Sequence, residues 1–386
     1  MLFKSVSQRR IIREILRQEG CPSSYMKYAD DIPREIPVNS FADYVSQLTS
    51  MPGIGNKHPQ EIIARTNRAL LRKAVINALK TRLFSENLPY IHLAYYPKGY
   101  RTVATFRIDC DESNQVDFDR VVNLAGLHNI PLTLFVHVKS QQSYLPHIAS
   151  IRQKGHDVQL HCYEHETYND YRNNLDNLIK GKKMMEEAGM KVSGFAAPYG
   201  KWNPFLNRVM EKLDFAFSSE FALCYDDLPF FPLINRHVSK VLQLPVHPVC
   251  VGLLRKAGLS PEEMKQYFDR TISEKYERNE PIMFYGHPYK EIDQYPEVFN
   301  YMLSRISQLS DIWITTYSEF ATWWKKRLHA RFTVRIKKKL TYITTGNSDP
   351  TLHLHIEKPD RSELLLPLAN QSFYTAEIMM DKTTPV

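Results

Sequence analysis

The sequence of 386 residues lacks any apolar run of the roughly 18 residues that a membrane-spanning helix needs. Its first residues, MLFKSVSQRRIIREIL, also lack the apolar core of a secretory signal peptide. Cysteines are few, scattered and odd in number, which argues against a disulfide framework and favours reduced thiols. Together these absences predict a cytoplasmic protein.

Motifs for nucleic-acid binding are missing as well. The chain has no Gly-rich RNA motif, no zinc-finger spacing and no helix-turn-helix pattern, so we expect no nucleic-acid partner. The net charge is +8, and basic residues are densest between 325 and 339. This run is typical of a solvated helix end and linker, and the alternative is peripheral contact with an anionic membrane surface.

The patterns along the chain indicate three regions, and the chain is longer than one ordinary domain. Residues 1–95 are predicted to be a helical N-terminal extension, because RRIIREILRQEG and PQEIIARTNRALLRKAVINALKTRLF carry apolar residues at helical spacing. Nothing in this extension looks catalytic. Residues 96–327 alternate short apolar strands with helices, which predicts parallel βα units of the α/β class. Residues 328–386 contain short runs of period two and are predicted to form a small β-rich C-terminal module.

Two polar clusters lie at predicted strand ends. Asp109 and Asp111 are two residues apart, so their side chains project together from a strand. His161 and His165 are four apart, and both face one side if that segment turns as a helix. An acid-rich turn or a chance histidine pair explains each cluster alone. Together they give two histidines and a carboxylate, which suit Zn²⁺ or a related divalent ion used in hydrolysis.

These clusters resemble the motifs of the polysaccharide deacetylases, the NodB homology domain of carbohydrate esterase family four. That family has an Asp-Asp pair, a Gly-His-(Asp/Glu)-led His-x-x-x-His segment, an Arg-x-Pro-Tyr-Gly segment and a late strand that ends in a histidine. Here the counterparts follow in the same order over residues 97–325, with one residue inserted in the Asp pair. The third is Ala196-Ala197-Pro198-Tyr199-Gly200 and the last is Phe284-Tyr285-Gly286-His287-Pro288. The resemblance implies a NodB-type distorted (β/α) barrel over residues 96–327.

The resemblance also implies a ligand set and a mechanism. Asp111, His161 and His165 would hold the ion, most readily Zn²⁺, with Co²⁺, Ni²⁺ or Fe²⁺ as alternatives. The ion would polarise the amide carbonyl and lower the pKa of a bound water. Asp109 would take the proton of that water, and His287 would protonate the leaving amine.

The resemblance implies a role for Tyr199, and three further residues are candidates for the same site. The backbone N–H of Tyr199 would help to hold the oxyanion, by family analogy. Either Glu220 or Asp226 is a candidate partner for His287, and His247 is a candidate to line the site.

One departure from the family pattern stands out. Ala196 occupies the position of an arginine that orients the base in the family. Arg107, two residues before Asp109 on the same strand face, is a candidate substitute, and the alternative is an ordinary basic residue near an acidic mouth. The Arg-Ile-Asp-x-Asp form also resembles the deformylase of lipid-linked amino-arabinose.

The predicted function is metal-dependent N-deacetylation of an amino sugar, in a polysaccharide or a lipid-linked glycan precursor. The alternatives are an impaired deacetylase-like carbohydrate-binding or scaffold protein, an N-deformylase of a lipid-linked sugar, and a surface-binding protein that uses its basic segments. Retention of Asp109 favours the enzyme, because an idle site has no physical need for a base. The sequence makes no prediction of the oligomeric state.

Overall fold

The computed structural model describes residues 7–42, 46–234, 237–337, 340–346 and 349–368. Contacts divide the chain into two compact units. We call residues 42–69 and 100–322 the sheet unit, and residues 1–41, 70–99 and 323–386 the flanking unit. The division falls within two helices, α2 (Arg68–Ser85) and α11 (Tyr317–Leu328). The three domain limits expected from the sequence stay a prediction, because compact units are not tests of independent folding.

The sheet unit is built on one sheet of eight strands in which neighbouring strands are parallel. The order is β11-β8-β7-β6-β5-β4-β12, and β13 pairs with β4. The predicted α/β class and the alternation of strands and helices are thereby confirmed. The strands are β4 (Thr102–Cys110), β5 (Thr133–His137), β6 (Asp157–Cys162), β7 (Gly194–Phe195), β8 (Phe217–Ser218), β11 (Leu242–Gln243), β12 (Ile282–Gly286) and β13 (Ile312–Ile314).

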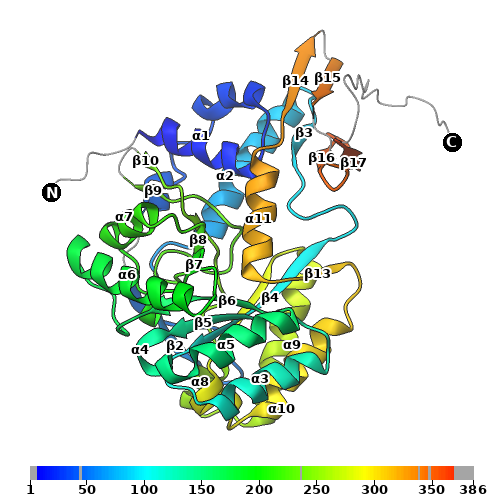
Figure 1. Cartoon of the computed structure of the whole chain (residues 1–386). Helices are drawn as coiled ribbons and strands as arrows, with labels where there is room; N and C mark the ends of the chain where they lie inside the picture. Colours follow the sequence, from blue (N-terminus) through cyan, green and yellow to red (C-terminus); the bar gives the residue numbers. More distant parts are fainter. Residues whose placement is uncertain (1–6, 43–45, 235–236, 338–339, 347–348, 369–386) are drawn as a thin grey trace. The chain divides into compact units, whose positions relative to one another are not determined.

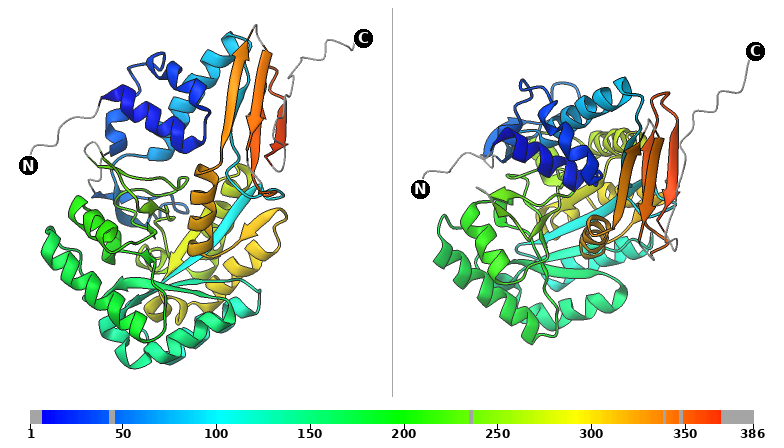
Figure 2. Two further views of the ribbon diagram at one scale, coloured as in Figure 1. Left: turned by 45° about the horizontal axis from the view of Figure 1, so that its top comes forward. Right: turned by 90° about the horizontal axis from the view of Figure 1, so that it is seen from above.

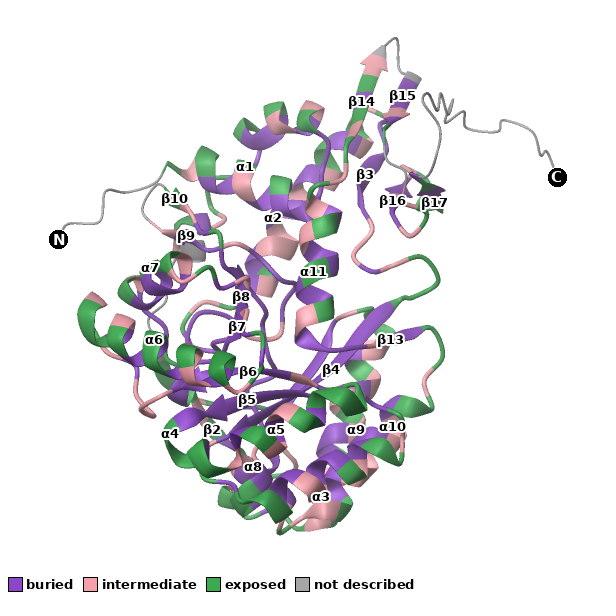
Figure 3. Cartoon of the chain, in the orientation of Figure 1, coloured by how far each residue is buried: buried purple, intermediate pink, exposed green. Residues whose placement is uncertain are grey.

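Helices pack against this sheet (Figure 1), and the residues of its central strands are buried. The burial colours show the central strands almost wholly buried, whereas the helices alternate between buried and exposed residues (Figure 3). Strands covered on both faces are typical of parallel sheets. The helices are α3 (Gln115–Gly126), α4 (Val138–Gln141), α5 (Leu145–Ile151), α6 (Tyr171–Glu187), α7 (Pro204–Lys212), α8 (Val251–Lys256), α9 (Pro261–Glu277) and α10 (Pro296–Ser307), with short turns η3 (Gln142–Tyr144), η4 (Arg152–Lys154), η5 (Pro198–Gly200) and η6 (Pro288–Ile292).

Strand β4 shows how the sequence separates core from site. Phe106 and Ile108 belong to the main hydrophobic core, and the Phe106 ring meets Phe299 of α10 with 5.9 Å between centroids. Arg107 and Asp109 alternate with them and are also buried. Because strand residues alternate in direction, one face of β4 packs the core and the other carries charge.

The segment 59–64 corrects the predicted N-terminal helix. It forms β2 (Gln60–Ala64), which pairs antiparallel with β1 (Ser46–Ser50). The ladder with β1 makes this segment a strand, and Ile62 is exposed while the next residue, Ile63, is buried. The hairpin is held in the sheet unit by an ion pair of 2.8 Å between Lys57 and Glu263 and by Ala64, whose N–H donates to the Phe221 carbonyl at 2.9 Å. A second hairpin in this unit pairs β9 (Leu233–Ile234) with β10 (His237–Val238).

The flanking unit combines helices from the first hundred residues with strands from both ends of the chain (Figure 2). The strand β3 lies beside β16 in a three-stranded antiparallel sheet of order β17-β16-β3. The predicted C-terminal strands are confirmed as strands. The elements are α1 (Gln8–Glu19), η1 (Ser23–Asp30), η2 (Val38–Ala42), β3 (Tyr90–Leu93), β14 (Phe332–Lys337), β15 (Leu340–Thr345), β16 (His353–Glu357) and β17 (Glu363–Pro367).

Arg327 corrects the prediction of a solvated basic run. Its side chain is fully buried inside the flanking unit, and it donates to the backbone carbonyls of Gln18, Leu93 and Ala94 at 3.1, 2.8 and 2.9 Å. A guanidinium has five N–H donors, so one side chain can join several chain segments. Across the described ranges, no helix is long and apolar enough to cross a membrane.

Candidate active site

A cleft of about 990 Å³ opens at the carboxyl ends of the parallel strands, within the sheet unit. Ligands of α/β folds gather at this edge because the loops that follow the strands converge there. All of the predicted metal ligands, the predicted base and the predicted acid line this cleft. The residues that line the cleft include Leu48, Glu61, Ile62, Asp109, Asp111, Glu112, His137, His161, His165, Tyr199, Lys201, Arg255, Lys256, Tyr285, His287, Lys290 and Glu291.

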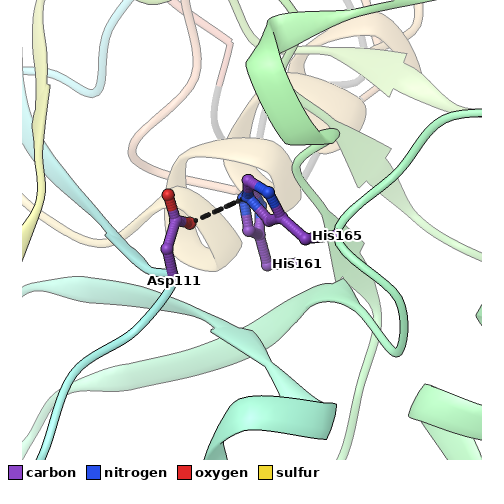
Figure 4. Close-up of side chains that lie close together, drawn as sticks. All are labelled: Asp111, His161 and His165. Carbon is purple, nitrogen blue, oxygen red and sulfur yellow. Dashed lines mark hydrogen bonds and ion pairs between the residues drawn. The ribbon is translucent and has the colours of Figure 1, made fainter.

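Asp111, His161 and His165 come together as a possible metal-binding group. Oδ1 of Asp111 lies 3.1 Å from Nε2 of each histidine, and the two Nε2 atoms are 3.2 Å apart. Figure 4 shows both imidazole rings turned toward the one carboxylate. Three donor atoms this close to one another can all contact a single ion, and two imidazoles with a carboxylate suit a divalent metal.

The hydrogen bonding of His161 fixes which ring nitrogen is left for an ion. Its Nδ1 lies 2.7 Å from the Ala196 carbonyl, which can only accept, so Nδ1 carries the proton and Nε2 keeps its lone pair. Burial alone would raise the pKa of Asp111, but His161 and His165 hold it well below its usual range. The residues therefore fit a divalent ion in both donor chemistry and protonation.

The loop that carries His165 differs from the expected helix. Residues 163–165 form a bend, and Cys162 at the end of β6 has a φ of 150° that turns the chain. Asn177 of α6 holds this loop: it accepts from the N–H groups of Tyr163 and Glu164 at 3.0 and 2.6 Å, and it donates to the Glu164 carbonyl at 3.0 Å. Asn177 carries no motif of its own and was not predicted from the sequence.

Arg107 makes a bidentate contact with Asp109. Its Nε and one terminal nitrogen each lie 2.6 Å from a different carboxylate oxygen, and the other terminal nitrogen donates to the Ser219 carbonyl at 2.5 Å. Both side chains are buried. Burial would raise the pKa of Asp109, but the Arg107 charge lowers it, so the carboxylate is held ionised and fixed in direction.

His287 has a partner that the sequence analysis did not identify. Its Nδ1 lies 2.8 Å from Oε1 of Glu291, and its Nε2 lies 3.7 Å from Oδ2 of Asp111. Burial would lower the pKa of His287, but the Glu291 carboxylate raises it well above its usual value. Glu291 is four residues further along the chain, where the turn η6 after β12 brings it back to the histidine.

The other acidic candidates lie elsewhere. Asp226 pairs with His247 at 3.0 Å and with Lys275 at 2.7 Å. His247 is buried and does not line the cleft, because its second nitrogen meets the Tyr267 hydroxyl at 3.0 Å. Glu220 is fully buried and also does not line the cleft.

Tyr199 and His137 complete the inner cleft. Tyr199 is exposed, has a φ of 57°, and its ring centroid lies 5.0 Å from that of His165. A positive φ at an aromatic residue is uncommon and is held by the surrounding Pro-Tyr-Gly turn. His137 ends β5, and its Nδ1 lies 2.9 Å from the Asp111 carbonyl, so it fixes the backbone of a ligand residue. His137 was not predicted from the sequence.

The hairpin of β1 and β2 forms one wall of the cleft through Leu48, Glu61 and Ile62. Leu48 and Ile62 are opposite each other across the hairpin, and their exposed fractions are 63% and 50%. Nothing in this region looked catalytic in the sequence, and its place at the cleft was not predicted because the segment had been assigned to a helix.

Comparison with known proteins supports the fold and the motifs. The family model of polysaccharide deacetylase matches residues 109–218, a range that begins at Asp109 and includes His161 and His165. A search of curated protein sequences found no match. A protein of Mycobacterium smegmatis described as a polysaccharide deacetylase is 17% identical, with 61% of this chain and 94% of that chain covered and a TM-score of 0.53.

Two further solved structures are similar at the same level. A protein of Pseudomonas aeruginosa PAO1 with the same description is 16% identical over 60% of this chain and 93% of its own, with a TM-score of 0.52. The Puue allantoinase is 15% identical over 60% and 93%, with a TM-score of 0.52. At these identities the likeness shows the fold alone, and it confirms the NodB-type distorted barrel with additional elements at both ends of the chain. The family model thus covers the segment that carries Asp109, His161 and His165, and the fold agrees with that of solved proteins described as polysaccharide deacetylases.

Proposed function

We propose that this protein is a metal-dependent hydrolase that removes the N-acetyl group from an amino sugar, in a polysaccharide or a lipid-linked glycan precursor. The observation that carries the proposal is Asp109, a buried carboxylate held by Arg107 in the same cleft as a complete metal-binding group. Burying a carboxylate is costly even when it is paired, and a general base at this position would account for that cost. The family supplies the substrate class, an acetylated carbohydrate.

Asp111, His161 and His165 are the proposed metal ligands. When bound, a divalent ion there supplies Lewis-acid activation of the amide carbonyl and of water, and Zn²⁺ is the metal that the donor set favours. The Nδ1–H of His161 stays on the Ala196 carbonyl, which keeps its other nitrogen directed at the ion site.

Asp109 is the proposed general base and His287 the proposed general acid. Arg107 keeps Asp109 ionised and directed, which is the role of the motif arginine that Ala196 replaces. Glu291 keeps His287 protonated, so that it can give a proton to the leaving amine nitrogen. The backbone N–H of Tyr199 is the proposed oxyanion donor.

The test combines metal content with acetate release, on wild type and on Asp109→Asn. We expect about one divalent ion in each protein, and acetate release only from wild type, from a panel of free and lipid-linked N-acetyl amino sugars that includes N-formyl analogues. The matched control is Asp119→Asn on α3, a partly exposed aspartate that contacts His147 at 3.0 Å.

Three results would change the proposal. If wild type binds no divalent ion, the ligand assignment is wrong. If Asp109→Asn keeps full activity, the base is wrong. If both bind metal and neither turns over any substrate, the protein is a binding protein on a deacetylase fold.

A further inference from the structure

Three cations that the proposed chemistry does not use line the same cleft. Arg255 and Lys256 lie on α8 and Lys290 lies on η6. The two elements contact each other, and Arg255 donates to Oε1 of Gln294, just after η6, at 2.7 Å. The cations therefore form one group at one side of the cleft, which we call the cationic rim.

The cationic rim is not neutralised by its own neighbours. Among the described residues, no carboxylate lies within 4.0 Å of any of the three side-chain nitrogens, whereas the fourth cation of the cleft, Lys201, pairs with Glu166 at 3.0 Å. Five carboxylates line the cleft: Asp109 is paired with Arg107, Glu291 is paired with His287, and Asp111 lies in the metal-binding group. The remaining two are Glu61 and Glu112. Three unpaired cations against two carboxylates leave this part of the cleft with excess positive charge.

The backbone conformation of Lys290 indicates that the surrounding turn holds this residue in place. Its φ is 61°, a conformation that costs on the order of 1 kcal/mol or more for a side chain with a Cβ. Lys290 is exposed, so no burial of its own offsets that cost. The turn is held by the N–H groups of Ile292 and Asp293, which donate to the carbonyls of His287 and Pro288 at 3.2 and 3.0 Å. The same turn thus fixes both His287 and Lys290 at the cleft.

We propose that the cationic rim is an anion subsite, and that the amino sugar which the cleft accepts carries a phosphate or carboxylate group. This rests on the proposed function for the sugar, but the anion subsite is a separate claim. A planar guanidinium with two ammonium groups can donate to several oxygens of one anion. Lys256 and Lys290 are exposed and Arg255 is half-buried, which puts the anion at the mouth of the cleft, away from the ion site.

The experiment measures binding, so that it does not depend on turnover. Metal-loaded protein is titrated by calorimetry with N-acetylglucosamine 1-phosphate, with N-acetylmuramic acid and with the neutral methyl glycoside of N-acetylglucosamine. We expect wild type to bind one of the two anionic sugars at least about tenfold more tightly than the neutral one at low salt, with the preference falling as KCl is added. The arm that shows the preference identifies phosphate or carboxylate as the anion.

Two variants assign the preference to the rim. The rim variant, Arg255→Gln with Lys256→Gln and Lys290→Gln, keeps every proposed metal ligand, and we expect it to lose the preference and keep its affinity for the neutral sugar. The control variant, Lys183→Gln with Lys191→Gln and Lys212→Gln, removes the same charge from exposed lysines outside the cleft, and we expect the preference to remain. Thermal unfolding checks that all three proteins are folded.

The outcomes separate the two proposals. A wild type without preference overturns the subsite, and so does a preference that survives in the rim variant, since the anion would then bind the metal. If the preference is present and depends on the rim while no acetate is released from any sugar, the subsite stands and the deacetylase proposal fails.

Discussion

At the scale of single residues, the site works by controlling protons with fixed neighbours. Arg107 keeps one carboxylate ionised, Glu291 keeps an imidazole protonated, and the Ala196 carbonyl selects a tautomer of His161. None of these neighbours touches an ion or a substrate in the proposed scheme. Each sets the state of a residue that does, which is how buried sites hold opposite charge states a few ångströms apart.

The buried Glu220 offers a test of how burial shifts the pKa of a carboxyl group near Arg107. Burial raises its pKa from 4.5 to about 7, so between these values the folded state binds a proton that the unfolded state has lost. Wild-type stability should therefore fall as pH rises from 4.5 through 7, by about 3 kcal/mol at about 1.4 kcal/mol per pKa unit. Glu220→Gln removes this loss, so its stability relative to wild type should increase over that range. Denaturant unfolding from pH 5 to 8 measures the difference.

An exposed glutamate provides the control for that experiment. Glu187→Gln on α6 should follow the wild-type pH dependence, because its side chain is 63% exposed. If Glu220→Gln and wild type keep a constant difference across the range, Glu220 is ionised in the folded protein at all these pH values and the raised pKa is refuted.

At the scale of elements, α6 positions the ligand loop from behind. Asn177 bonds three backbone groups of residues 163 and 164, and Gly181 one turn later lets the helix approach: a Cβ there would lie 3.1 Å from the Tyr163 nitrogen. Helix α6 thus supplies hydrogen-bond partners for backbone groups of the loop, which forms no regular helix or strand of its own.

Asn177→Ala tests this support. The loop would lose its side-chain donors and acceptors, and we expect metal affinity to fall by roughly 10- to 100-fold, as it does when groups that orient ligands are removed. Competition with a chromophoric chelator measures the affinity. Asn173→Ala is the matched control, because that exposed residue bonds only to Asp170 nearby. Equal affinities in both variants would show that the loop holds its shape alone.

The elements also show what could be predicted from the sequence. Asp111, His161 and His165 were predictable as neighbours, because parallel strands bring their carboxyl ends to one edge of a sheet. Glu291 and Asn177 were not, since each acts through a loop whose shape no local pattern reveals. The hairpin at 46–64 was missed because EII within a longer apolar stretch fits a helix and a strand equally well. Arg327 was misjudged because its partners are backbone carbonyls, which a sequence does not display.

At the scale of the whole molecule, the site belongs to one of the two compact units. All cleft-lining residues lie within residues 42–69 and 100–322, which make up the sheet unit. A bound ion should therefore stabilise that unit directly. A ligand that binds only the folded state raises the free energy of unfolding by about 2.7 kcal/mol when its free concentration is 100 times its dissociation constant.

Hydrogen exchange can locate that stabilisation. Adding Zn²⁺ to metal-free protein should slow exchange in β4, β5 and β6 and in the loop 163–165, and leave β3, β16 and β17 unchanged. Asp111→Asn removes a ligand and should abolish the protection. Protection of β16 without protection of β6 would place the ion elsewhere.

The pairing of β3 with β16 has a consequence for how the protein is made. His92 and His355 face each other across this pair, 263 residues apart in sequence. At a synthesis rate of about 5 to 20 residues per second, β3 must wait roughly 13 to 50 s for its neighbour. During that time the polypeptide emerging from the ribosome can complete the parallel sheet, while the flanking unit stays open at a strand edge, so nascent chains expose their aggregation-prone surface there until translation is nearly finished.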